Sequence, residues 1–96
     1  MTTFIILGKL TPKAIENVKE MAERDAKGEQ VIKAADGKLL TLYYTLGRYD
    51  FVALVDLPSE EALVKVLLEL GKRGTISTET LTALKPEQVY RAAQGL

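Results

Sequence analysis

The segment Leu46–Asp50 holds the side chains that are best suited to chemistry. Arg48 can bind an anion, while Tyr49 and Asp50 can donate or accept hydrogen bonds and protons. The segment separates two strongly apolar runs, which is typical of a hairpin loop, so all three residues are candidate ligand-binding residues. The structural alternative is that Asp50 binds loop amides or pairs with Arg48, while Tyr49 packs over the sheet edge.

Tyr43 and Glu79 form a second candidate group, because both fall on predicted strands. A tyrosine and a carboxylate beside an apolar wall are suited to proton transfer. Thr41 and Thr45 would line the same ligand pocket on the sheet. The structural alternative is a subunit interface in which these hydroxyls are hydrogen-bonded.

The residue inventory excludes several kinds of site. The chain has no Cys and no His, which rules out disulfides, thiolate nucleophiles, histidine acid–base pairs and most zinc sites. Asp56, Glu60 and Glu61 are acidic neighbours that could bind a hard cation. The two glutamates are better explained by the start of a helix, where negative charge is favourable. We therefore expect no metal site and no cofactor.

The charge balance argues against two classes of partner. Lys plus Arg and Asp plus Glu both number 13, so the net charge of zero attracts neither nucleic acid nor an anionic membrane.

The apolar run Phe4–Leu7 has no basic residues ahead of it and is too short for a signal core or a membrane span. Together with the lack of Cys, this predicts a cytoplasmic protein.

Six main elements and a C-terminal helix must position the candidate residues, within a single domain of residues 1–96. Apolar and β-branched runs predict the strands, and helical spacing with capping signals predicts the helices. The predicted strands cover residues 4–10, 38–46, 50–57 and 75–84, and the predicted helices cover residues 12–35, 60–70 and 86–93. The apolar stripe of the first helix shifts after Gly28, so we expect a kink or a break near Lys27–Gly28, with a second helical piece to about Ala35.

The element order β-α-β-β-α-β is that of the split βαβ, ferredoxin-like α+β fold. Right-handed crossovers give a four-stranded antiparallel sheet in the order 4-1-3-2, with two helices on one face. The first and third strands are the most apolar, as central strands should be. The second and fourth strands carry the Thr, Tyr and Glu expected at sheet edges. A short C-terminal helix follows.

The sheet is expected to expose an apolar face. A five-residue hairpin loop would place Thr45 opposite Phe51, because cross-strand register decides which side chains share a face. Phe51 and Val55 would then lie with Tyr43 away from the helices. An exposed apolar patch of this kind usually marks an interface.

The second helix is also more apolar than a lone domain requires. Its apolar side chains cover about 240° of the helix circumference, well beyond the stripe that a surface helix needs. Val64 and Leu68 point to one side, where they are covered either by the C-terminal helix through Val89 and Ala92 or by another subunit. From both surfaces we expect a homodimer or a larger homo-oligomer.

The hairpin sequence resembles a known family. The segments Tyr44–Phe51, Val55–Pro58 and Thr78–Leu81 resemble the GYD-domain family, and the resemblance extends from about Thr3 to Pro86. Its short motif, Gly-(Arg or similar)-Tyr-Asp, is matched by Gly47, Arg48, Tyr49 and Asp50. The resemblance implies a ferredoxin-like fold of the kind that pairs into dimeric α+β barrels. The family carries no established activity, so no catalytic role is transferred.

Two classes of function remain. The favoured class is a non-catalytic homo-oligomeric module that binds a small ligand or a partner. The alternative is a cofactor-free small enzyme of the dimeric α+β barrel class, such as an isomerase or a monooxygenase. A filled sheet interface would favour the module, whereas a closed apolar pocket with an inward Tyr or Glu would favour the enzyme. The expected partners are a second copy of the chain and a small apolar ligand.

Overall fold

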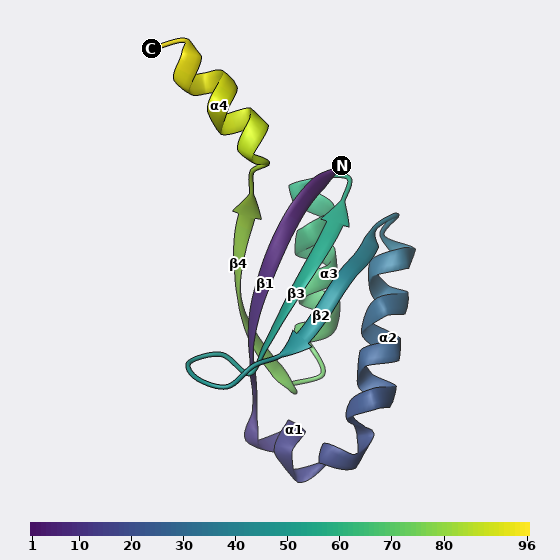
Figure 1. The fold of residues 1–96 in the computed structure, drawn as a ribbon. Coiled ribbons are helices and arrows are strands. Elements are labelled where there is room, and N and C mark those ends of the chain that lie inside the picture. Colours follow the sequence, from purple (N-terminus) through teal and green to yellow (C-terminus); the bar gives the residue numbers. More distant parts are fainter.

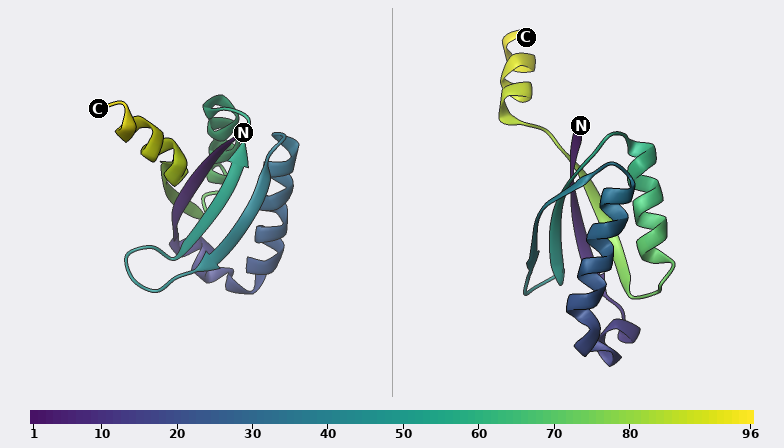
Figure 2. Two further views of the ribbon diagram at one scale, coloured as in Figure 1. Left: turned by 45° about the horizontal axis from the view of Figure 1, so that its top comes forward. Right: turned by 90° about the vertical axis from the view of Figure 1, so that its right-hand side faces the viewer.

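The computed structural model describes residues 1–96, and its four strands form one antiparallel sheet in the order β2-β3-β1-β4. This confirms the predicted strand order and the ferredoxin-like α+β fold. Figure 2 shows α2 and α3 on the same side of the sheet, as expected from right-handed crossovers. The elements are β1 (Thr2–Leu10), α1 (Pro12–Glu16), the 3-10 turn η1 (Val18–Glu20), α2 (Met21–Ala34), β2 (Lys38–Tyr44), β3 (Phe51–Leu57), α3 (Glu60–Gly71), β4 (Ile76–Ala83) and α4 (Pro86–Gln94) (Figure 1).

The helices begin where the capping signals predict. The Thr11 hydroxyl accepts a hydrogen bond from the Ala14 N–H at 3.3 Å, and Pro12 follows at the first helical position. The Ser59 hydroxyl likewise accepts from the Ala62 N–H at 3.1 Å. The helices are all too short or too polar to cross a lipid bilayer.

The first helical segment is interrupted earlier than predicted. α1 ends at Glu16, whereas α2 runs without a break through Gly28, so the prediction of a kink near Lys27–Gly28 is wrong. Arg24 stabilises the real break, because its guanidinium donates to the carbonyl oxygens of Asn17 at 2.9 Å and Ala14 at 3.2 Å. A side chain from the next helix thus binds carbonyls near the end of α1.

The hydrophobic core lies between the sheet and the two long helices. Its β1 and β3 side chains alternate along each strand, as a sheet with one covered face requires. The helices contribute one buried side chain from α2 and two from α3. The core comprises Phe4, Ile6, Ile32, Ala53, Val55, Leu57, Leu63 and Val66.

The prediction of which β3 side chains point toward the helices is wrong. Tyr44, rather than Thr45, lies opposite Phe51, so the hairpin loop consists of six residues, 45–50, instead of five. A shift of one residue moves every side chain of a strand to the other face. Val55 is therefore fully buried beneath the helices, while Val52 and Leu54 point away from them.

The side of the sheet on which each β2 side chain lies is predicted correctly from Thr41 to Tyr44. The prediction fails for the residues of β2 that precede Thr41. Thr41 lies opposite Leu54 on the exposed side, as expected. A bulge between Leu39 and Thr41 then changes the register, so Leu39 lies opposite Val55 on the helix side. Leu39 packs against the core instead of facing away from it.

The side of the sheet opposite the helices is apolar in its middle. Leu7 pairs with Val52 and Ile5 pairs with Leu54 across the two central strands, and all four side chains are half-buried. The two edge strands add exposed side chains, one of them a tyrosine that is 65% exposed. We call this surface the open sheet face, and it comprises Ile5, Leu7, Tyr43, Val52, Leu54 and Leu81.

The C-terminal helix α4 points away from the rest of the domain (Figures 1 and 2). All of its residues are exposed, including Val89 and Tyr90. Val64 and Leu68 of α3 remain 51% and 67% exposed, so the alternative in which α4 covers them is wrong. The projecting helix gives a radius of gyration of 14.8 Å, compared with about 13 Å for a compact domain of this length.

Candidate functional site

Asp50 ties the hairpin loop to the central strand β1. Its backbone N–H donates to the Gly8 carbonyl oxygen at 2.7 Å, and its carboxylate accepts a hydrogen bond from the Leu10 N–H at 2.8 Å. Thr45 closes the loop base, because its N–H donates to the Asp50 carbonyl oxygen at 2.8 Å and its hydroxyl donates to the Tyr49 carbonyl oxygen. Asp50 thus holds β1, and it neither binds loop amides nor pairs with Arg48.

The substitution Asp50→Ala should lower the free energy of unfolding by about 1–2 kcal/mol, because the Leu10 N–H loses a charged acceptor in a half-buried position. Urea unfolding monitored by circular dichroism would measure this loss. Asp50→Asn is the matched control, since its amide oxygen can still accept the same hydrogen bond and should retain part of the stability. An Asp50→Ala variant as stable as the parent chain would contradict a structural role for the carboxylate.

Tyr49 crosses over β1 and reaches β4. Its hydroxyl donates a hydrogen bond to the carboxylate of Glu79, and the ammonium of Lys9 lies 5.9 Å from the centre of its ring. The hydrogen bond to Glu79 raises the pKa of Tyr49, and partial burial adds to the effect. Tyr49 therefore stays protonated near neutral pH and acts as a hydrogen-bond donor.

The structure brings Tyr49 and Glu79 together, and Arg48 lies close enough to the Tyr49 hydroxyl to oppose the rise in its pKa, whereas Tyr43 and Asp50 lie elsewhere. Tyr43, Val52, Leu7 and Glu79 form one row across the sheet, because each lies opposite the next. Three strand spacings separate Tyr43 from Glu79, so their Cα atoms are about 14 Å apart. Arg48 is exposed on the loop. The predicted pocket between Tyr43 and Glu79 is therefore not formed within one chain.

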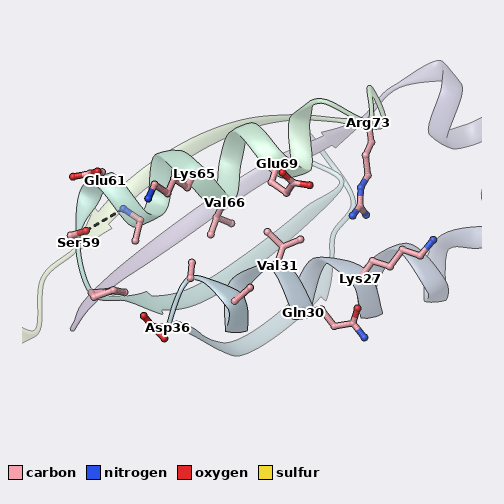
Figure 3. A pocket seen from close by; sticks show the side chains of 14 residues that line it. Lys27, Gln30, Val31, Asp36, Ser59, Glu61, Lys65, Val66, Glu69 and Arg73 are labelled. Carbon is pink, nitrogen blue, oxygen red and sulfur yellow. Dashed lines mark hydrogen bonds between the residues drawn. The ribbon is translucent and has the colours of Figure 1, made fainter.

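A wide groove of about 780 Å³ runs between α2 and α3 on the outer side of the molecule (Figure 3). Its apolar floor includes Val31 and Val66. Figure 3 shows charged side chains of both signs along its length, among them Lys65 and Glu69. No group of three or more acidic side chains in the protein is placed to hold a metal ion.

Sequence reasoning missed a second hollow, which lies between α2 and the loop end of the sheet. The Tyr44 hydroxyl donates to the Asp25 carboxylate at 2.7 Å at its edge. Burial, the hydrogen bond and the negative charge of Asp25 raise the pKa of Tyr44 to about 12. The one signal in the sequence was Gly28, which shifted the helical pattern without breaking the helix.

Comparisons with known proteins agree with the fold. A family model described as GYD domain matches residues 4–93. A curated protein of Thermus thermophilus, named glutamine synthetase and cystathionine beta-lyase binding protein, is 33% identical over 85 residues, which cover 88% of this chain and 90% of that protein.

Two solved structures have the same fold. The crystal structure of TTHA0845 from Thermus thermophilus is 28% identical, with a TM-score of 0.56 over 88% of this chain and 95% of that one. The structure of AsnC from E. coli is 27% identical, with a TM-score of 0.60 over 88% of this chain. The matched region is 51% of the AsnC chain, so this chain corresponds to about half of that protein.

Proposed function

The chain belongs to the GYD domain family, and from this membership and its exposed apolar surfaces we propose that it is a non-catalytic homo-oligomeric module that binds another protein. The observation that carries the proposal is the curated relative, which is one-third identical over nearly the whole of both chains and is named for binding two enzymes. More specifically, we propose that the partner is an enzyme of amino-acid metabolism and that binding takes place in the cytoplasm.

The open sheet face supports self-association. Its apolar middle is half-buried in one chain and would be removed from water if a second copy packed against it. Polar pairs flank this middle, because Thr3 donates to Asp56 at one end and Tyr49 donates to Glu79 at the other. An apolar centre with a polar rim is typical of a protein interface. Two-fold symmetry is the commonest way to close it.

The helix α4 is the surface best suited to a protein partner. It carries Val89, Tyr90 and Ala93 on one side and Glu87 and Arg91 on the other, which is amphipathic spacing. The Gln88 side chain accepts a hydrogen bond from the Lys85 N–H at 2.8 Å, so the helix start is satisfied locally. Amphipathic helices of this kind bind by placing the apolar side in a groove of the partner.

The alternative class, a cofactor-free enzyme, receives less support from the geometry. The side chains that would transfer a proton are Tyr43, Tyr49 and Glu79. Tyr49 and Glu79 already satisfy each other through a hydrogen bond, and the raised pKa of Tyr49 keeps its hydroxyl protonated as the donor. Tyr43 lies at the far edge of the sheet. A hydrogen-bonded pair at the rim of an interface fits these positions better.

The proposal is tested by surface plasmon resonance with the chain immobilised and purified glutamine synthetase and cystathionine beta-lyase from the same host in solution. We expect saturable binding of at least one enzyme. Val89→Glu should weaken it roughly tenfold or more, as expected for a central apolar contact. Gln94→Glu, which adds the same charge to the polar side of α4, should bind as the parent chain does. Binding of neither enzyme would contradict the proposal.

A further inference from the structure

The hydrophobic core is incomplete at the end of the sheet from which the hairpin loop leaves. A cavity of about 100 Å³ lies there between α2 and the sheet, and we call it the α2 cavity. Most of its lining is apolar, and much of it is only half-buried: Leu42, Phe51, Leu70 and Ile76 all remain accessible. Since an apolar cavity of about 150 Å³ can hold benzene, this one has room for a branched alkyl group.

Gly28 keeps the α2 cavity open. Glycine in the middle of a helix costs about 0.5–1 kcal/mol relative to alanine, yet α2 is regular at this point and needs no glycine for its backbone. Close packing does not require glycine either. A Cβ atom built there would have only Leu70 nearby, at an ordinary contact distance of 3.7 Å. The effect of having no side chain at this position is therefore that the chain's own atoms do not fill the cavity.

The mouth of the α2 cavity carries one cationic group that the fold leaves unpaired. Arg24 is held by two backbone carbonyls, and Asp25 accepts the hydrogen bond from Tyr44. Arg73 lines both the α2 cavity and the groove between α2 and α3 and is half-buried, yet its guanidinium makes no hydrogen bond or ion pair within the chain. Figure 3 shows it reaching from the end of α3 toward α2.

The backbone around Arg73 is fixed. Its carbonyl oxygen accepts a hydrogen bond from the Lys13 ammonium at 2.9 Å, and the Gly74 carbonyl oxygen accepts one from the Thr11 hydroxyl at 2.7 Å. The guanidinium therefore extends from an anchored turn. A planar guanidinium with free donors matches the two oxygens of a carboxylate.

From these observations we propose that the α2 cavity binds a small branched-chain carboxylate, with the alkyl group inside the cavity and the carboxylate on Arg73. The site lies on the helix side of the sheet. It is therefore separate from the open sheet face and from α4, and it does not depend on the proposed binding of an enzyme. Glu29, a second charged group at the mouth, makes no ion pair in the chain and would favour an ammonium group instead.

The test is an NMR titration of the ¹⁵N-labelled full chain with 3-methylbutanoate, 3-methylbutan-1-ol and 3-methylbutylammonium, at one pH and ionic strength. We expect saturable shifts of the Gly28, Tyr44 and Ile76 amides with the carboxylate, and binding of the alcohol about tenfold weaker or more, because it lacks a charge-assisted hydrogen bond. The absence of saturable shifts at these amides would overturn the site. Equal or tighter binding of the ammonium compound would overturn the assignment of a carboxylate.

Two variants locate the binding. Arg73→Gln should weaken carboxylate binding about tenfold and leave alcohol binding unchanged, whereas Lys72→Gln, which changes the neighbouring exposed cation, should alter neither. Gly28→Leu should abolish binding of both by filling the cavity. If Gly28→Leu fails to fold, the comparison of the three compounds on the parent chain still decides the proposal. Carboxylate binding that is unchanged in a folded Arg73→Gln variant would overturn it.

Discussion

Leu54→Arg should convert the proposed oligomer into a folded monomer. Leu54 lies on the central strand β3, opposite Ile5 and Thr41 of its two neighbours, in the middle of the open sheet face. A lone chain leaves this position half-exposed, so an arginine there can remain in water and the fold should persist. In a dimer, two unpaired guanidinium groups would be buried at the centre of the interface. Because an unpaired buried charge costs several kcal/mol, the dissociation constant should rise by roughly a thousandfold.

Sedimentation equilibrium at high micromolar concentration would measure this change in mass. Val64→Arg tests the second exposed apolar surface, since it places the same charge on α3, on the other side of the molecule. If Val64→Arg dissociates the oligomer and Leu54→Arg does not, the interface lies on the helices. A parent chain that sediments as a monomer would refute self-association altogether.

Gly8→Ala should lower the free energy of unfolding by about 2–3 kcal/mol, which is at the upper end for overpacking in a core. Gly8 lies directly opposite Phe51 in the β1–β3 pair, and the Phe51 ring occupies the space above it. A Cβ atom on residue 8 would come within 2.0–2.6 Å of three ring atoms. The ring would have to leave its position and its edge-to-face contact with Tyr44, whose centroid is 6.4 Å away.

A double-mutant cycle isolates this contact. In the Phe51→Ala background the added methyl group has room, so Gly8→Ala should cost much less there, with a coupling energy of about 1–2 kcal/mol. Urea unfolding of the four proteins gives the coupling directly. Additive effects of the two substitutions would show that the ring does not limit the space at residue 8.

The order of the strands could be predicted from the sequence because it depends on local patterns. Apolar runs identified β1 and β3 as the central strands. The right-handedness of crossover connections then left one arrangement for the edge strands β2 and β4. The face of β3 could not be predicted in this way. It depends on whether the loop holds five or six residues, and Asp50 decides this by bonding to Gly8 and Leu10 of a strand forty residues earlier.

The position of the break before α2 and the arrangement of the candidate site could not be predicted, for the same reason. The break depends on Arg24, which binds carbonyls seven and ten residues before it. The Tyr49–Glu79 pair depends on the loop folding across β1 to a strand that is adjacent only in space. The residue types in the loop indicated which side chains could do chemistry, but only the tertiary contacts determine which of them meet.

The detachment of α4 has a consequence for how this protein can change over evolutionary time. Most substitutions are removed by selection because they push a marginally stable domain below its folding threshold. Every residue of α4 is exposed and its first turn is capped from within, so its sequence is largely free of that constraint. Under the proposed function, specificity for a protein partner can therefore diverge in this helix while the sheet and its core remain unaltered.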